Sequence, residues 1–316
     1  MQSLFVMDPL DRIQVAGDST YMLMRELSDR GQPVWMCTPD ALDARNGRGY
    51  ALARQVITTR DAPHFEVVAE EERDLGGFDV VWMRKDPPFD MSYILATYIL
   101  DMAPPSTLVV NDPAGLKLYN EKIWAMQFPS IHPPTLLSSS AERIRDFVST
   151  HGRAVLKPWD GNGGRGVLVT GAGDRNLNSM IELLTADGRE KILAQAFVEG
   201  ADDGDKRILL FDGEPVGQML RIPTSEDYRG NMHVGARVAA CELSPRDVEI
   251  CRILGPRLSE LGMIFVGIDV ISGYLTEINV TSPTGIQEIN RLFGLRLEAT
   301  LIDLVARRLE LRRESL

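Results

Sequence analysis

An acid and an amide lie two positions apart in the stretch LTEINVTSPTG, as Glu277 and Asn279. The apolar residues around them predict a strand, on which side chains two positions apart point to the same face. Asp269 lies on the preceding apolar run, and a turn at Ser272-Gly273 would bring it opposite Glu277. Three oxygen donors that converge in this way match the ligands of Mg²⁺. A solvated hairpin face fits less well, because the neighbouring residues are apolar and a buried acid pair without a counter-ion is costly.

A lysine at the end of a predicted strand is followed by a glycine-rich turn in KPWDGNGGRGV, residues 157–167. The backbone N–H groups of such a turn can cradle phosphate oxygens, and Lys157 would add positive charge. The motif is not a Walker A loop, since no Gly-Lys-Ser/Thr follows, and a following strand excludes a Rossmann fingerprint. A glycine-rich hairpin with an exposed lysine is the alternative that the motif alone leaves open.

Two further segments carry polar groups that suit a nucleotide or an anionic substrate. The strand end AQAFVEG, with Glu199, could hold an adenine edge and a ribose hydroxyl, although a charged loop between two strands explains it as well. Arg207 and Arg221 lie on a predicted hairpin, and Arg229 lies in the connection after it. Arginine forks bind carboxylates and phosphates with two hydrogen bonds. Their position favours capture of an anionic substrate over surface pairing.

The elements that would position these groups begin with alternating short apolar runs and helical patterns in residues 1–120, which predict a parallel α/β sheet. In such a sheet, ligands gather beyond the carboxyl ends of the strands. The polar residues at these ends are Asp8, Arg84, Lys85, Asp86 and Asn111. The expected strands are residues 4–7, 33–37, 50–58, 79–84 and 107–111. The expected helices are 21–30 and 91–103, and Asp18, Ser19 and Thr20 would supply N-cap chemistry for the first of these helices.

A domain boundary is expected within residues 112–135, where the composition changes and prolines gather. Beyond it, residues 223–240 show no clear period, and long connections of this kind usually form lids or are disordered. The remaining pattern predicts helices at 139–152, 175–187, 244–262, 286–293 and 296–313, strands at 154–160, 163–171 and 192–198, and hairpins at 206–223, with an Asp212-Gly213 turn, and 265–280.

The composition restricts the class of protein. With 316 residues, two or three domains are expected, and a formal net charge of -11 argues against nonspecific binding to nucleic acid or to an anionic membrane. The first residues lack a basic segment and a long apolar run, which predicts no signal peptide, and no apolar stretch is long enough to span a bilayer. Three cysteines without a CxxC pair disfavour disulfides and zinc. We expect a soluble, reduced, cytoplasmic protein.

The motifs taken together resemble a known family. The segments VMDPL, MRKDPPFD, ATYILD, NEK, LKPWDGNGG, DGDKR, DGEPV, RIP, RGN, FVGIDV and LTEINVTSPT occur in the order found in bacterial glutathione synthetases of the ATP-grasp superfamily. The resemblance covers essentially the whole chain. It implies an α/β (α+β overall) ATP-grasp fold with a pre-ATP-grasp domain at 1–121 and an ATP-grasp domain at 122–316. The latter would comprise a central lid subdomain, about 122–200, and a C-terminal subdomain, about 201–316.

The resemblance also implies the reaction, in which ATP drives the ligation of γ-glutamylcysteine and glycine to glutathione through an acyl phosphate. It implies ATP as co-substrate, Mg²⁺ as cofactor with Mn²⁺ as a second candidate, and a homodimer or homotetramer. The implied nucleotide-binding residues are Lys122, Lys157, Gly161, Asn162, Gly163, Gly164, Gln195, Ala196, Phe197, Val198, Glu199 and Asp205. The implied catalytic, substrate-side residues are Arg207, Arg221, Arg229, Asn231, Ser282 and Thr284. The implied metal ligands are Asp269, Glu277 and Asn279.

The chain departs from the family pattern SPTCIRE, because it carries Gly285 and Gln287 in SPTGIQE. Two alternatives therefore stay open. One is a related ATP-grasp ligase that takes a different amino acid or peptide. The other is an ATP-binding protein without catalysis, against which the complete set of predicted lysines and metal ligands argues.

Overall fold

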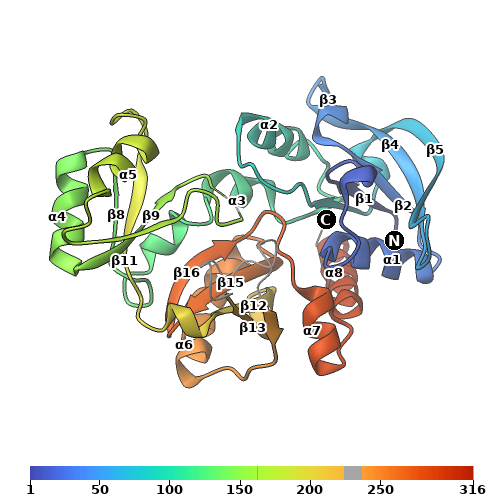
Figure 1. The fold of residues 1–316 in the computed structure, drawn as a ribbon. Helices are drawn as coiled ribbons and strands as arrows, with labels where there is room; N and C mark the ends of the chain where they lie inside the picture. The colour runs from blue at the N-terminus through green and yellow to red at the C-terminus, as the bar shows by residue number, and fades with distance from the viewer. Residues whose placement is uncertain (162, 224–236, 316) are drawn as a thin grey trace.

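The computed structural model describes residues 1–161, 163–223 and 237–315. Figure 1 shows three sheets, each with its own helices: one near the N-terminus, one formed by β8–β11 at the left, and one formed by β12–β16 in the lower centre. The mixed α/β class that the sequence predicts is confirmed. Short 3₁₀ helices lie at Leu10–Arg12, Pro39–Ala41, Leu75–Gly77, Trp124–Gln127 and Ala201–Asp203.

The N-terminal sheet has the predicted parallel core, because β1 pairs in parallel with β2 and β6, and β6 with β7. The Asp18 side chain caps the first helix by accepting from the Tyr21 N–H at 2.6 Å, as its residue type predicts. At the strand ends, Lys85 pairs with Asp8 at 3.0 Å. The elements are β1 Ser3–Val6, α1 Ser19–Asp29, β2 Val34–Cys37, β6 Val80–Met83, α2 Met91–Leu100, β7 Leu108–Val110 and α3 Pro113–Leu118.

The expectation of an all-parallel sheet is wrong at one edge. The strand β4 (Arg48–Thr58) pairs antiparallel with β3 (Leu42–Arg45), with β5 (Phe65–Asp74) and with β2. The β3–β4 turn is Asn46-Gly47, with φ of 52° and 76°. Asn-Gly is the residue pair that two-residue hairpin turns with positive φ prefer, so the signal was present in the sequence.

The second sheet has the order β10-β9-β11-β8 and is covered by α4 and α5. The strand expected at 163–171 begins only at Leu168, because Gly163, Gly164 and Gly166 have φ between 62° and 73°, which extended strands do not allow. The elements are β8 Thr135–Ser138, α4 Ala141–His151, β9 Arg153–Pro158, β10 Leu168–Gly171, α5 Leu177–Leu184 and β11 Ile192–Ala196.

The third sheet has the order β14-β13-β12-β15-β16 and contains both predicted hairpins. Asp212 and Gly213 form the first turn with φ of 52° and 85°, as predicted. Residues 224–236, most of the predicted lid, lie outside the described residues, while residues 237–239 form a strand instead of irregular chain. The elements are β12 Asp205–Phe211, β13 Glu214–Ile222, β14 Arg237–Ala239, α6 Pro245–Glu260, β15 Phe265–Ile271, β16 Tyr274–Asn279, α7 Ile286–Phe293 and α8 Leu297–Glu314.

The first and third sheets are joined by a shared core. Asn111, at the end of β7, donates to the Phe265 and Val280 carbonyls and accepts from the Phe265 N–H, all at 2.8 Å. Phe5 and Leu301 belong to one buried apolar cluster although they come from opposite ends of the chain. Asn111 thus joins the first and third sheets, where a ligand contact was expected because of its position at a strand end.

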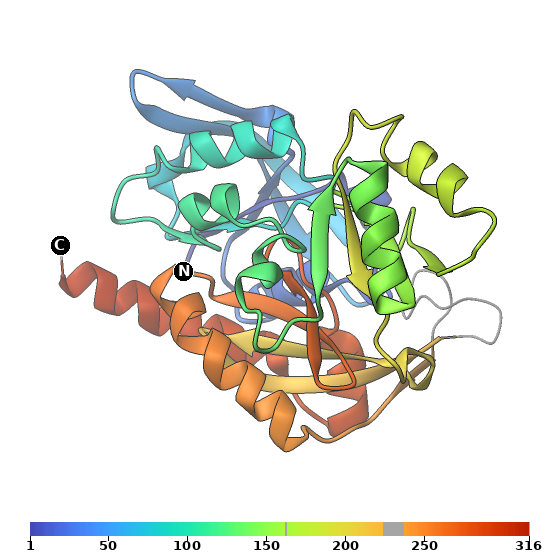
Figure 2. The ribbon, with the colours of Figure 1, turned by 90° about the vertical axis from the view of Figure 1, so that its left-hand side faces the viewer.

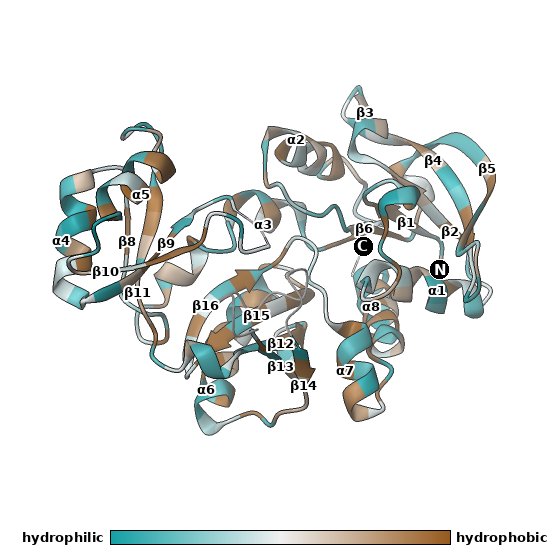
Figure 3. Ribbon diagram, in the orientation of Figure 1, coloured by the Kyte–Doolittle hydropathy of each residue, from teal (hydrophilic) through white to brown (hydrophobic). Residues whose placement is uncertain are grey.

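The second sheet has a small core of its own, formed by five buried residues: Ile144, Leu156, Ile181, Ile192 and Ala194. Figure 1 shows this sheet with α4 and α5 at the left, apart from the other two sheets, and Figure 2 shows the same part of the molecule from its own side. In Figure 3, α4 carries mainly hydrophilic residues, while β16 carries both hydrophilic and hydrophobic ones. The separate core supports the division that we propose: 1–121, 122–200 and 201–316.

Candidate active site

The predicted metal ligands share one face of the third sheet with Arg207 and Arg221. In the strand register, Asp269 on β15 lies opposite both Arg207 on β12 and Glu277 on β16, and Asp205 lies opposite Arg221. The prediction that the hairpin places Asp269 opposite Glu277 is confirmed. A register shift after Asp269 marks a bulge, a device that re-aims side chains at the edge of a site.

Asp269 is surrounded by donors. The Arg207 guanidinium donates to both of its oxygens, at 2.6 and 3.1 Å, and Arg221 lies 3.0 Å from Oδ1. The Asn279 amide donates to Oδ2 at 3.2 Å. Arg221 also pairs with Asp205. The arginines expected on the substrate side therefore hold an acid in this structure, and Asp205, expected near the nucleotide, belongs to the same ion-pair cluster.

These contacts set the charge states of the cluster. Burial acts to raise the pKa of Asp269, but Arg207 and Arg221 together outweigh it and lower the pKa to about 2. Asp269 is therefore ionised at neutral pH. Within the described chain, the buried Arg221 Nε and Asp205 Oδ1 atoms have no hydrogen-bond partner. Such atoms are the points at which an additional polar group would be stabilised.

Two buried lysines approach the same carboxylates from other parts of the chain. Lys122, just before the 3₁₀ helix at 124–127, lies 3.5 Å from Glu277 and donates to the Gly161 carbonyl of the glycine-rich turn. Burial lowers the pKa of Lys122, and Glu277 and Glu121 more than reverse this effect, so that its pKa is raised. Burial also lowers the pKa of Lys157, and the negative charge of Glu277 partly offsets this lowering. Lys157 is 6% exposed. This burial excludes the alternative interpretation of the motif, a glycine-rich hairpin with an exposed lysine.

The Gln195 side chain is directed at Lys157 and is 4% exposed. Its Oε1 accepts from Lys157 Nζ at 3.2 Å, and its Nε2 lies 3.2 Å from His132 Nε2 and 3.1 Å from the Thr135 hydroxyl. These partners orient the side chain toward Lys157. His132 was not singled out from the sequence, since a lone histidine in the segment SIHPPT gives no signal of its contacts.

The rest of the predicted nucleotide segment lies at the end of β11. The Ala196 and Phe197 N–H groups already donate to the Pro134 and Arg153 carbonyls, and the Arg153 guanidinium lies over the Phe197 ring at 3.8 Å. Val198 accepts from the Ala201 N–H. The Glu199 side chain is 81% exposed and 3.7 Å from Arg153, so it is open to a ribose or to solvent.

The Ser-Pro-Thr turn after β16 is held through its backbone. Arg84, buried in the N-terminal domain, donates to the Pro283 carbonyl at 2.9 Å, and Arg207 donates to the Thr284 carbonyl at 3.2 Å. The Ser282 hydroxyl donates to the Arg84 carbonyl at 3.3 Å. Arg84 was expected at a ligand-binding edge, and it instead fixes this turn. Of the remaining predicted residues, Asn162, Arg229 and Asn231 lie outside the described residues.

The candidate metal ligands fit a hard divalent cation in their chemistry. Asp269, Glu277 and Asn279 supply oxygen donors on one sheet face, and the Asn279 amide donates through nitrogen, which leaves its oxygen as an acceptor. Asp269 already accepts four hydrogen bonds or ion pairs, so it can bind a cation only when one of these donors leaves. Among the described residues, no group of three or more His, Cys, Asp or Glu could hold a metal, so the amide is needed.

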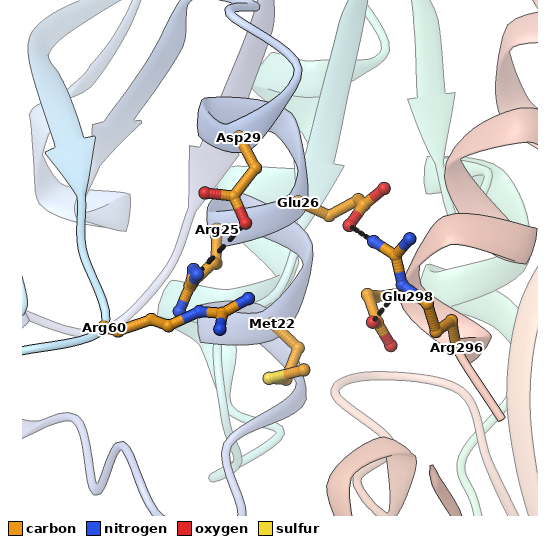
Figure 4. Close-up of a pocket in the computed structure, with 7 residues that line it drawn as sticks. All are labelled: Met22, Arg25, Glu26, Asp29, Arg60, Arg296 and Glu298. Atoms are coloured by element: carbon orange, nitrogen blue, oxygen red, sulfur yellow. Dashed lines mark hydrogen bonds and ion pairs between the residues drawn. The ribbon is translucent and has the colours of Figure 1, made fainter. Parts of the chain in front are cut away.

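Two cavities lie away from this cluster. One, of about 490 Å³, lies between α1 and the start of α8. Figure 4 shows that five of its charged side chains form ion pairs within the cavity: Arg25 with Asp29, and Arg296 with Glu26 and Glu298. The other, of about 410 Å³, contains the ion pair of Lys206 and Asp247. Neither is lined by the lysines or carboxylates of the site.

The buried His132 gives the molecule a measurable pH dependence. Burial, with repulsion from Lys157, lowers the pKa of His132 to about 4 from its ordinary 6.5, although its bond to the Pro133 carbonyl opposes the shift. Between pH 6.5 and about pH 4, His132 is protonated in the unfolded chain but neutral in the folded chain. The free energy of unfolding should therefore fall as the pH falls through this range. The slope from this group is at most about 1.4 kcal/mol per pH unit. Urea unfolding of wild type and His132→Gln across this range checks it, because equal slopes would contradict the assignment.

Comparison with known proteins settles the family. The family model of the prokaryotic glutathione synthetase N-terminal domain matches residues 1–117, and that of the ATP-grasp domain of the same enzymes matches residues 121–294. The chain belongs to the prokaryotic glutathione synthetase family. The resemblance that the motifs indicate is thereby confirmed.

Relatives of known name agree with this assignment. The chain is 47% identical to a glutathione synthetase of Thermosynechococcus vestitus, over 94% of this chain and 97% of the relative. It is 44% identical to that of Gloeobacter violaceus, over 96% of both chains. The identity to the glutathione synthetase of Brucella melitensis is also 44%, over 96% of this chain and 97% of the relative.

Solved structures agree in fold. The D-cycloserine synthetase DcsG superposes with a TM-score of 0.68 at 13% identity, over 96% of this chain and 99% of the other. The ATP-grasp ligase PsnB, in complex with a phosphomimetic precursor, Mg and ADP, superposes with a TM-score of 0.64 at 16% identity, over 98% and 99%. At these identities the likeness shows the ATP-grasp fold alone. Among the described helices, none has the length and apolar character that a membrane span requires.

Proposed function

We propose that the chain is a glutathione synthetase, an ATP-dependent ligase that joins γ-L-glutamyl-L-cysteine to glycine through an acyl phosphate and releases ADP and phosphate. The observation that carries the proposal is the approach of two buried lysines, Lys122 and Lys157, to the partly exposed Glu277. The three residues come from three segments of the chain. Lys122 lies 3.5 Å from Glu277, and the Glu277 carboxylate opposes the lowering by burial of the pKa of both lysines. Family membership supports the same reaction.

The chemistry explains why cations and acids are needed together. A carboxylate resists attack by an amine, and phosphorylation turns it into an acyl phosphate with a good leaving group. The protein contributes by holding charge where it develops, since phosphoryl transfer depends on positioning and electrostatics. In this proposal, Lys122 and Lys157 bind phosphate oxygens, and Gly161, Gly163 and Gly164 cover them.

The family uses ATP with a divalent metal. We propose Mg²⁺, with Mn²⁺ as a second candidate, held by Glu277, Asn279 and Asp269. When bound, the metal would neutralise charge on the phosphates. The carboxylates that would hold it are oriented by this chain's own residues, Asp269 by Arg207 and Arg221, and Glu277 by its neighbour Lys122.

The substrate side would be formed by the arginine cluster and the Ser-Pro-Thr turn. Arg207 joins the two, because it contacts both Asp269 and the Thr284 carbonyl. Arg221 retains a buried Nε without a partner among the described residues, so it has a donor available for an anionic group. The Ser282 and Thr284 hydroxyls, both in half-buried residues, would face the γ-glutamyl peptide.

The test is a stoichiometric assay with ATP, Mg²⁺, γ-glutamylcysteine and a panel of amino acids. We expect one ADP and one phosphate for each tripeptide, with glycine as the preferred acceptor, and mass spectrometry identifies the product. ADP release should require both the peptide and glycine, because the site protects the acyl phosphate from water. Steady ATP turnover without any amino acid, at a comparable rate, would overturn the mechanism. Product formed only with another amino acid would point to a related ligase.

The assembly and location of the protein are part of the same proposal. From the family resemblance, we infer a homodimer or homotetramer in the cytoplasm. Light scattering of the purified protein at micromolar concentration tests the first statement, and a mass equal to one chain would contradict it.

A further inference from the structure

The contacts of His132 suggest a role in the reaction that the lysines alone do not explain. His132 is 5% exposed and lies on the segment that enters the second sheet, directly before β8. Its Nδ1 lies 2.7 Å from the Pro133 carbonyl, which can only accept, so Nδ1 carries the proton. In the neutral ring, Nε2 is then an acceptor, and it faces the Gln195 amide at 3.2 Å.

The position of the proton on His132 determines which way the Gln195 amide points. Because Nε2 of His132 accepts, the NH₂ group of Gln195 must face it, and the second N–H of that group meets the Thr135 hydroxyl at 3.1 Å. The amide oxygen is then directed at Lys157 Nζ, 3.2 Å away. The opposite orientation would place an NH₂ group against the ammonium group and an oxygen against the Nε2 lone pair. Both contacts would be repulsive in a buried site, where unpaired polar groups are costly.

We propose that His132 and Gln195 are positioning residues that hold the Lys157 ammonium group for the nucleotide phosphates. The proposal rests on the proposed function, in which Lys157 binds those phosphates. It assigns to the Gln195 side chain a role different from contact with adenine. The strand β11, which carries Gln195, pairs with β9, which carries Lys157, and His132 lies just before β8, the other neighbour of β11. The chain of hydrogen bonds therefore holds the lysine in a fixed orientation relative to the second sheet.

The test compares ADP binding and steady-state kinetics of wild type, His132→Phe, His132→Gln and Gln195→Leu. His132→Phe keeps a flat ring but removes the acceptor, so we expect the Kd for ADP and the KM for ATP to rise about tenfold, the size expected for one hydrogen bond to a charged group. His132→Gln supplies an acceptor at a similar distance from the backbone and should restore most of the affinity. The KM for γ-glutamylcysteine should stay within about twofold of wild type, since the other substrate groups are unchanged.

Two controls separate positioning from packing. His151→Phe changes an exposed histidine on α4 in the same subdomain and should leave every parameter unchanged. A double variant, His132→Phe with Gln195→Leu, should lose no more nucleotide affinity than Gln195→Leu alone, because His132 acts only through Gln195.

The outcomes are distinct. The proposed positioning of Lys157 by His132 and Gln195 would be overturned if His132→Phe bound ADP with wild-type affinity. It would also be overturned if the losses of ADP affinity in the double variant were additive. If the KM for ATP and the KM for the peptide rose equally in His132→Phe, and His132→Gln did not restore them, the positioning role would also be overturned. His132 would then act only by packing. If the wild-type protein bound ADP but made no tripeptide, the proposed function would be wrong. The positioning of Lys157 by His132 and Gln195 could still be tested by ADP binding.

Discussion

Replacing Glu277 by Gln should lower the turnover of tripeptide synthesis by roughly 10²–10³-fold, the loss seen when one preorganised electrostatic group is removed from an active site. Gln keeps the shape of the side chain but not the negative charge that would bind the cation and that pairs with Lys122 at 3.5 Å. Folding should change little, because the Glu277 side chain is 25% exposed and Lys122 retains the neighbouring Glu121 as a counter-charge. The free energy of unfolding should stay within about 1 kcal/mol of wild type.

The experiment measures initial rates over a range of Mg²⁺ concentrations, with urea unfolding of the same samples. Glu214→Gln is the matched control, since Glu214 is an exposed residue of β13 in the same sheet and away from the cluster. Near wild-type turnover of Glu277→Gln at saturating Mg²⁺ would remove Glu277 from the proposed metal site.

Asp269→Asn should have a different signature, because it should cost stability as well as activity. Arg207 and Arg221 are 7% and 5% exposed, and both depend on the Asp269 charge. Removing one member of a buried ion-pair cluster leaves the other charges without compensation, which typically destabilises a protein by about 3–5 kcal/mol. The low pKa of Asp269, about 2, has the same origin. Turnover should also be lost, since Asp269 is one of the proposed metal ligands.

Asp247→Asn serves as the control for a loss of stability alone. Asp247 is 2% exposed and pairs with Lys206, and its carboxylate accepts from the Ser244 N–H at 2.8 Å in the capping box of α6, all outside the cluster. This variant should unfold at lower urea concentration but retain its turnover at 25 °C. If Asp269→Asn unfolds like wild type, the arginines do not depend on it, and the cluster would have to be reinterpreted.

Several features of the fold follow from signals that act over only a few positions of the sequence. The hairpin that places Asp269 opposite Glu277 follows from apolar alternation and from a turn at Ser272-Gly273, with φ of 45° and 79°. The Asp18 cap and the Asp212-Gly213 turn are equally local. The β3–β4 hairpin also had a local signal, Asn46-Gly47, and the all-parallel expectation overlooked it.

The sequence by itself therefore determined most of the elements, the family and the residue types of the site, because turns, caps and side-chain periodicity act over a few positions. Only the tertiary structure decided which charges meet. Lys122 meets Glu277, Arg84 holds the Pro283 carbonyl, and His132 meets Gln195, each across at least 63 positions of chain. Local rules cannot predict such contacts, because they depend on how separate sheets pack. Buried charges also need partners of opposite charge, and only the folded chain determines which such partners lie close enough.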